Sequence, residues 1–227
     1  MSEPDSLPLP GPLLDALAES RRWGFLGEGP LDVHVAHALG FAEAAEAFGS
    51  ADGSWLDLGS GGGIPGLILA HHWPDRPAIL LDSNERRAQF LLEVVAGLGW
   101  EDRVQVIMER AEVAGRQVGL RGALSLVVAR SFGAPPVTAE CAAPFLRTGA
   151  ALIVSDPPST GSSGDLTDAR WPPEGLALVG LERVGARRSI FGYQVLRQAR
   201  ECPDRFPRRV GVPAKRPLYT VRTDRAG

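Results

Sequence analysis

Residues 55–66 read WLDLGSGGGIPG, and this stretch decides the fold. Residues 54–59 form a short apolar run typical of a buried strand, and glycines follow at positions 59, 61, 62, 63 and 66. Glycine tolerates positive φ and lets the backbone approach a ligand without an intervening Cβ. Residues 64–73 predict a helix with Pro65 in its first turn, where a missing N–H costs nothing. A glycine-rich turn between a strand and a helix is typical of a nucleotide-binding βαβ unit.

Short apolar runs and helical stretches alternate around this unit. Further strands are expected at 78–83, 104–108, 124–129 and 151–155, and helices at 12–23, 31–48, 85–99 and 137–146. This alternation predicts an α/β fold with a doubly wound, mostly parallel sheet.

The pattern changes after Ser155. Residues 156–175 read as a polar loop, and two antiparallel strands, 176–186 and 189–199, follow with a tight turn near Arg187–Arg188. We expect short N-terminal helices in an extension over residues 1–50, and a second region, 51–227, that holds the sheet, the C-terminal hairpin and a basic tail.

The charge is unevenly distributed along the chain. The 227 residues carry a net charge of −3, but residues 1–182 carry about −12 and residues 183–227 about +9. A basic C-terminal region predicts a partner with negative charge.

The composition also excludes several classes of protein. No apolar run reaches the ~18–20 residues of a membrane helix, and the acidic, Pro-rich start lacks the features of a signal peptide, so a cytoplasmic protein is expected. Cys141 and Cys202 have neither metal-ligand spacing nor a disulfide framework and predict small buried thiols. The four histidines lack companion ligands at metal spacing, so no metal site is expected.

The glycine turn fits two ligand patterns. Residues 59–63 match G-x-G-x-G, and residues 61–66 match G-x-G-x-x-G. Asp82, at the end of the second strand, can accept both ribose hydroxyls of an adenosine. Asp57, inside the first strand, either orients the glycine loop or caps neighbouring N–H groups. A terminal hairpin is not the second half of a dinucleotide-binding fold, so the sequence favours S-adenosylmethionine over NAD and an NAD-dependent oxidoreductase.

Five stretches resemble one family. Residues 56–70, 81–92, 109–112, 127–132 and 206–218 are similar to the bacterial 16S ribosomal RNA guanine-N7 methyltransferases, once called glucose-inhibited division protein B. The resemblance implies a class I methyltransferase fold, S-adenosylmethionine as cofactor, and methylation of N7 of a guanine in the 16S rRNA of the small ribosomal subunit. A monomer is expected.

The resemblance also implies residue roles. The cofactor-binding set is Gly59, Ser60, Gly61, Gly63, Ile64, Asp82, Ala111, Glu112 and Arg130. Arg86 and Arg87 stand where the family has basic residues and are expected to bind RNA, with a solvated face as the alternative. The basic charge of the tail itself predicts phosphate contacts by Arg205, Arg208, Arg209, Lys215 and Arg216. The catalytic candidates are Arg130 and, by position only, Asp156. Two further alternatives stay open: Glu112 as a surface carboxylate, and Arg130 in a structural ion pair with Asp57 or Asp82.

The chain departs from the family after the fifth strand. The family usually has Lys-Gly there, whereas this chain has Ser155-Asp156-Pro157-Pro158, and its N-terminal region is short. The alternative is therefore a diverged class I methyltransferase that acts on another RNA or on a small molecule. Asp156-Pro157-Pro158 also resembles the motif of amine methyltransferases, but that motif follows the fourth strand and ends in an aromatic residue, so a loop is the preferred interpretation.

Overall fold

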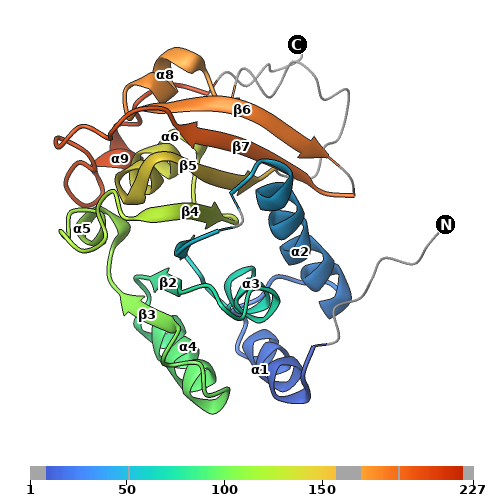
Figure 1. Ribbon diagram of the computed structural model, residues 1–227. Coiled ribbons are helices and arrows are strands. Elements are labelled where there is room, and N and C mark those ends of the chain that lie inside the picture. Colours follow the sequence, from blue (N-terminus) through green and yellow to red (C-terminus); the bar gives the residue numbers. More distant parts are fainter. Residues whose placement is uncertain (1–8, 51, 157–169, 189, 222–227) are drawn as a thin grey trace, which may run out of the picture.

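The computed structural model describes residues 9–50, 52–156, 170–188 and 190–221, and in these ranges a seven-stranded sheet organises the chain (Figure 1). The strand order is β3-β2-β1-β4-β5-β7-β6. The strands are β1 Trp55–Leu58, β2 Ala78–Asp82, β3 Val104–Met108, β4 Leu124–Ala129, β5 Leu146–Ser155, β6 Leu181–Arg188 and β7 Gly192–Gln198. β1 to β5 pair in parallel, whereas β7 runs antiparallel to both β5 and β6. The predicted doubly wound sheet with a C-terminal antiparallel hairpin is confirmed.

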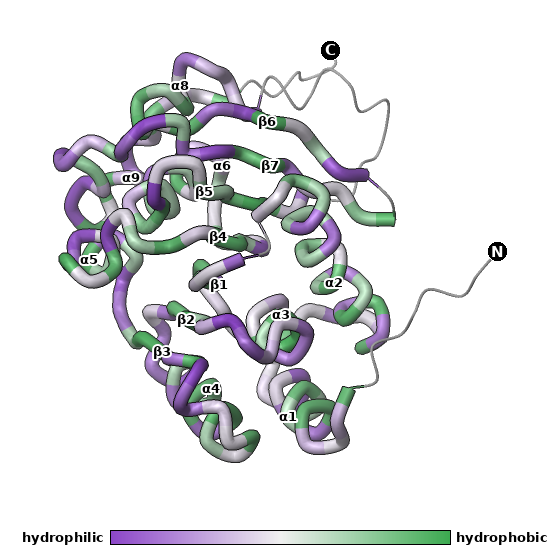
Figure 2. Tube along the Cα trace, in the orientation of Figure 1, coloured by the Kyte–Doolittle hydropathy of each residue, from purple (hydrophilic) through white to green (hydrophobic). Residues whose placement is uncertain are grey.

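Helices cover both faces of this sheet. They are α1 Gly11–Arg22, α2 Leu31–Ala47, α3 Gly66–His72, α4 Glu85–Gly97, α5 Ala111–Ala114, α6 Pro135–Ala142, the 3-10 turn η1 Ala143–Phe145, α8 Pro173–Ala177 and α9 Val212–Lys215. Side chains alternate between the two faces of a strand. Trp55 therefore packs with α1 to α4 on one face, and Leu56 packs with α5, α6 and α8 on the other. Figure 2 shows hydrophobic residues, in green, along the inner strands that both layers cover.

Several predicted boundaries were wrong. α3 begins at Gly66, not residue 64, because residues 60–65 form the turn itself. β5 begins at Leu146, not residue 151; the start was missed because the exposed residues 147–149 that follow Leu146 interrupt the apolar signal. The helix expected at 137–146 ends at Ala142, and Pro144 lies in the 3-10 turn that follows.

The C-terminal hairpin also differs from the prediction. Residues 173–177 form α8, and a left-handed turn at Gly180 precedes β6, so the strand does not begin at residue 176. β6 continues through Arg188, so the turn lies after Arg187–Arg188 rather than on them. Pro157 and Pro158 lie outside the described residues.

The N-terminal helices share the main core. Leu13 and Leu17 of α1 and Phe41 of α2 are fully buried against the sheet layer. The boundary between 1–50 and 51–227 stays a prediction. Cys141 and Cys202 are buried free thiols, as expected. Among the described residues no helix is both long and apolar enough to cross a bilayer.

Candidate functional site

The glycine turn is held at the carboxyl end of β1. Gly59, Gly61 and Gly63 have φ of +76°, +55° and +94°, a region in which a side chain is strained. The N–H groups of Gly59 and Ser60 donate to the Leu81 carbonyl at 2.8 and 3.0 Å. The turn is therefore fixed to β2, next to the predicted ribose acceptor.

Most of the glycines are required by the protein's own packing. A Cβ on Gly62 would lie 2.4 Å from Ser20 Oγ, one on Gly63 2.4 Å from Leu67 Cδ1, and one on Gly66 2.5 Å from Leu80 Cδ2. A Cβ on Gly61 would instead meet its nearest atom, the Gly59 carbonyl, at an ordinary 3.7 Å. Gly61 is thus the position in the turn where space remains for a ligand.

Two carboxylates fix the two ends of this turn. Asp57 is fully buried, and its Oδ2 accepts the Gly66 N–H at 2.9 Å, which supports its loop-orienting role. Burial raises the pKa of Asp57 to about 7, and its Oδ1 has no partner in the described part of the chain. Asp82 accepts the Gly61 N–H at 2.8 Å through Oδ2 and the Asn84 N–H at 2.8 Å through Oδ1.

These residues fit the adenosine half of S-adenosylmethionine. A carboxylate oxygen has two lone pairs, so each Asp82 oxygen still has room for a ribose hydroxyl. The unobstructed Gly61 lies directly beside it. The carboxylate of Asp82 and the open side of Gly61 therefore suit a ribose at the end of β2.

Ala111 and Glu112 lie in α5, just after β3. Both are buried, so the surface-carboxylate alternative for Glu112 is wrong. Glu112 Oε1 accepts the Gly211 N–H at 2.9 Å, and its Oε2 lies 3.7 Å from Arg110 Nε. Glu112 therefore attaches the C-terminal tail to the end of the sheet.

Arg130 follows β4 and faces α2 rather than the glycine turn. Its Nη2 lies 2.9 Å from His34 Nδ1. A guanidinium only donates, so Nδ1 accepts and His34 Nε2–H donates to the Gly27 carbonyl at 3.1 Å. No ion pair joins Arg130 to Asp57 or Asp82 within the described ranges, so that alternative is wrong.

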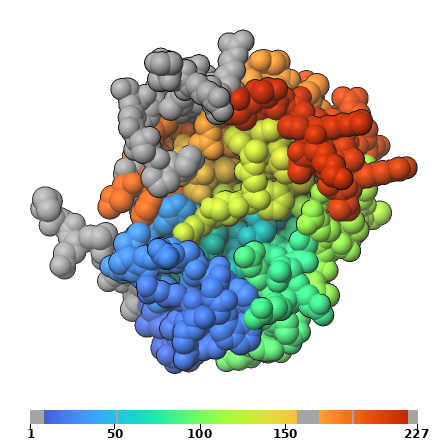
Figure 3. Space-filling model, turned by 180° about the vertical axis from the view of Figure 1, so that it is seen from behind, coloured from blue at the N-terminus to red at the C-terminus, as the bar shows by residue number. Residues whose placement is uncertain are grey.

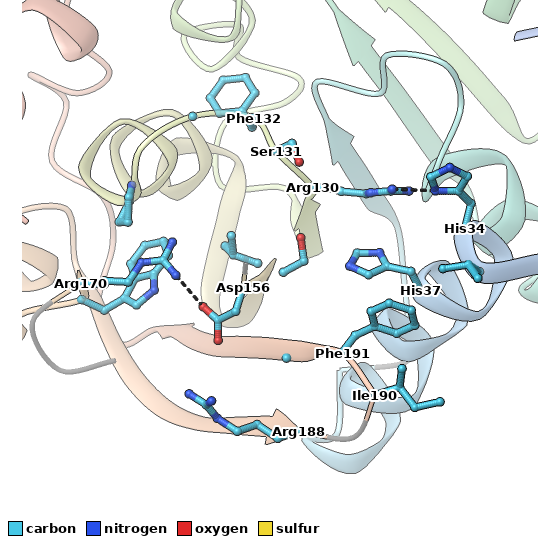
Figure 4. Close-up of a pocket in the computed structure, with 17 residues that line it drawn as sticks. His34, His37, Arg130, Ser131, Phe132, Asp156, Arg170, Arg188, Ile190 and Phe191 are labelled. Carbon is cyan, nitrogen blue, oxygen red and sulfur yellow. Dashed lines mark hydrogen bonds and ion pairs between the residues drawn. The ribbon is translucent and has the colours of Figure 1, made fainter. Parts of the chain in front are cut away.

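A pocket of about 590 Å³ opens beside Arg130 (Figure 4). Its walls come from α2, the loop after β4, the end of β5 and the segment before β7. The lining residues are Val33, His34, His37, Arg130, Ser131, Phe132, Gly133, Pro135, Val154, Ser155, Asp156, Arg170, Trp171, Arg188, Ile190, Phe191 and Gly192. This volume lies within the range of small-molecule sites.

Phe132 connects the pocket with the glycine turn. Its ring lines the pocket, and a Cβ on Gly59 would lie 2.7 Å from its Cδ2. Ser131 beside it has φ of +53°, a strained value for a residue with a side chain. The two halves of the site therefore share one aromatic wall at the carboxyl ends of β1 and β4.

Asp156 and His37 supply the polar chemistry of the pocket. Asp156 Oδ1 accepts from Arg170 Nη1 at 3.1 Å, and Oδ2 accepts from Gln194 Nε2 at 3.1 Å. Burial and the nearby Arg130 charge lower the pKa of His37 to about 4, so its ring is uncharged at neutral pH. The contact between Arg130 and His34 was not predicted, because residues 96 positions apart give no local pattern.

The predicted RNA-binding residues divide into two surfaces. Arg86 and Arg87 begin α4, which packs against α1, and the tail residues lie at 205–216. Figure 3 shows the blue N-terminal helices at the bottom of one face and the red C-terminal segment at its upper right. Arg208 differs from the other tail cations because its N–H and Nε donate to Glu140 Oε1, and its Nη2 donates to Oε2 at 2.6 Å.

Comparison with known proteins identifies the family. The GidB family model, described as rRNA small subunit methyltransferase G, matches residues 29–155. The ribosomal RNA small subunit methyltransferase G of Prochlorococcus marinus is 38% identical over 165 residues, covering 72% of this chain and 67% of that protein. The protein of the same name from Thermotoga neapolitana is 40% identical over 170 residues, covering 73% and 72%.

Solved structures agree on the fold. A candidate O-methyltransferase from Klebsiella pneumoniae has a TM-score of 0.58 at 16% identity, covering 84% of this chain and 91% of that chain. A MtNAS variant in complex with S-adenosylmethionine has a TM-score of 0.52 at 14% identity, covering 83% and 73%. The class I methyltransferase fold is confirmed, and the match to a methyltransferase family supports the predicted S-adenosylmethionine cofactor. This chain belongs to the GidB family of rRNA small subunit methyltransferases G.

Proposed function

We propose that this chain transfers the methyl group of S-adenosylmethionine to N7 of a guanine in the 16S rRNA of the small ribosomal subunit. The observation that carries the proposal is the wall shared by the glycine turn and the pocket. Phe132 lines the pocket and lies over Gly59. In open α/β sheets ligands bind outside the carboxyl ends of strands where the strand order reverses, here between β1 and β4.

In the proposal the cofactor occupies the β1–β2 side of this wall. Asp82 accepts the ribose hydroxyls beside Gly61, and Asp57 keeps the turn in shape through its bond to Gly66. The proposed cofactor-binding set remains Gly59, Ser60, Gly61, Gly63, Ile64, Asp82, Ala111, Glu112 and Arg130. Ser60 and Ile64 are themselves almost fully buried, so they support the turn from within.

The target base occupies the pocket on the β4–β5 side. Guanine N7 has a lone pair and no proton, so its attack on a sulfonium methyl needs no general base. Alignment and exclusion of water then supply most of the rate. This agrees with the two histidines of the pocket, His34 and His37, neither of which bonds to a carboxylate among the described residues. Asp156 lines the same pocket, but Arg170 already neutralises its carboxylate, so Asp156 serves the proposal as part of the pocket wall.

The RNA must present an unpaired or extruded base. Extrusion from a stack costs a few kcal/mol, and loop RNA lowers that cost. Arg205, Arg209, Lys215 and Arg216 are exposed and suited to phosphate contacts. Arg208 is left out of the proposed set, because its guanidinium already binds Glu140. The proposal also includes a monomeric chain in the cytoplasm.

The test is transfer of radiolabel from S-adenosylmethionine to small subunits, and to 16S rRNA stripped from them, both lacking N7-methylguanine. Label should map to one guanine and disappear in Asp82→Ala. Asp102→Ala, which removes an exposed carboxylate, is the matched control and should keep full activity. Intact binding of S-adenosylhomocysteine with no label in either RNA would show that the acceptor has changed in this chain.

A further inference from the structure

Trp23 is presented at the carboxyl end of α1. Its side chain is 45% exposed, which is unusual for so large an aromatic residue. Its ring centroid lies 5.6 Å from that of Phe25, in an edge arrangement, and 5.9 Å from that of Phe90. The ring is therefore held by packing on one side and open on the other.

Arginines lie on the aromatic cluster that Trp23 forms with Phe25 and Phe90. The guanidinium carbons of Arg86 and Arg87 lie 5.9 and 6.0 Å from the centre of the Phe25 ring, and Arg21 is exposed in the last turn of α1. Within the described residues none of these three arginines forms an ion pair with a carboxylate. We call Arg21, Trp23, Phe25, Arg86 and Arg87 the Trp23 platform.

The platform rests directly on the glycine turn. Ser20 Oγ donates to the Gly62 carbonyl at 2.8 Å. A Cβ on Gly62 would lie 2.7 Å from Leu26 Cδ2 and 2.9 Å from the Phe25 carbonyl carbon. A chain held on the platform is therefore adjacent to the turn proposed to hold the cofactor.

We propose that the Trp23 platform is a binding site for single-stranded RNA, in which one base stacks on Trp23 and the three arginines hold the neighbouring phosphates. The inference rests on the proposed function for the identity of the RNA. Base stacking on an aromatic ring combined with a cationic surround is the usual construction of single-strand sites. A protein partner would need a wider apolar surface, whereas the cluster of Trp23 and Phe25 carries arginines that form no ion pair among the described residues.

The first test measures the dissociation constant of a short fluorescein-labelled single-stranded RNA by fluorescence anisotropy. Trp23→Ala should weaken binding by roughly 5- to 150-fold, the range for loss of one stacked base. Trp23→Phe should restore part of the affinity. Leu14→Ala removes a residue of the same helix that is 40% exposed and should bind within about twofold of the wild type.

A separate control tests whether each variant is folded. Each variant should retain its melting temperature and its affinity for S-adenosylhomocysteine. If Trp23→Ala does not fold, the paired change Arg21→Gln and Arg86→Gln replaces it. Both residues are exposed, and removing two phosphate contacts should reduce the salt dependence of log K by roughly 1.4.

The outcomes separate this inference from the proposed function. If Trp23→Ala and the paired arginine change both bind RNA like the wild type while the wild type labels small subunits, the platform is refuted and the function stands. If RNA binding depends on Trp23 but no rRNA is labelled, the proposed function is refuted and the platform stands. A wild type that prefers an acidic peptide to RNA would refute the platform as an RNA site.

Discussion

The most informative perturbation is a pair of glycine-to-alanine changes within the same turn. Gly61→Ala places its Cβ at an ordinary 3.7 Å from the Gly59 carbonyl oxygen, so its cost is that of an alanine in the left-handed region, about 1–2 kcal/mol. Gly66→Ala places its Cβ 2.5 Å from Leu80 Cδ2 and 2.6 Å from Asp57 Oδ2. Overpacking of that kind costs about 1–3 kcal/mol, and disturbing the Asp57 bond adds to it.

The two variants should therefore fail in different ways. Differential scanning calorimetry should show a fall of roughly 3–6 °C for Gly61→Ala and a larger fall for Gly66→Ala. Titration calorimetry with S-adenosylhomocysteine should show at least about a tenfold loss of affinity for Gly61→Ala, because the added methyl group occupies the ligand's space. Wild-type affinity in a folded Gly61→Ala protein would refute the assignment of the open side of the turn to the cofactor.

Three further predictions concern stability and RNA binding. Glu140→Gln breaks the ion pair between the fully buried Glu140 carboxylate and Arg208, whose side chain is 27% exposed. Loss of these charged hydrogen bonds should cost ~2–3 kcal/mol and lower the melting temperature by roughly 4–12 °C; an unchanged melting curve would contradict the structural role of the pair. Burial raises the pKa of Asp57 from its ordinary 3.8 to about 7. The carboxyl group of Asp57 therefore stays protonated to a higher pH in the folded state than in the unfolded state. Urea unfolding should accordingly show stability falling as pH rises from about 4 to about 7 and levelling above it, and Asp57→Asn should remove that component; the same pH slope in both proteins would refute it. Replacing Arg209 and Lys215 by Gln should leave the melting temperature unchanged and reduce the salt dependence of log K for RNA by roughly 1.4, and an intact slope would exclude the tail from phosphate binding.

The sequence predicted the fold because its signals are local. A strand, a glycine turn and a helix occur within residues 54–73, and the strands repeat the same apolar pattern. The early start of β5 was missed because Arg147 and Thr148 are exposed, and the start of β6 was misplaced because apolar residues of α8 resemble a strand. Periodicity cannot separate short apolar runs of the two kinds.

The site was less predictable because it depends on distant contacts. A glycine in a sequence does not reveal whether a ligand or the protein fills the place of its side chain. A Cβ added at Gly62 would clash with α1, and one added at Gly66 would clash with β2. Only the folded chain distinguishes these two glycines from Gly61. Arg208 likewise reads as a free cation until Glu140, 68 residues earlier, is seen beside it. Pairs of this kind leave no pattern in one sequence.

The acceptor proposed for this chain is N7 of a guanine in small-subunit rRNA. The most direct measurement compares 16S rRNA transcribed with guanine and with 7-deazaguanine, which carries carbon in place of N7. Both transcripts are tested alone and after reconstitution into small subunits with labelled S-adenosylmethionine. We expect label in the guanine RNA and none in the 7-deazaguanine RNA. Equal labelling of the two would contradict N7 as the acceptor and would move the methyl group to another atom.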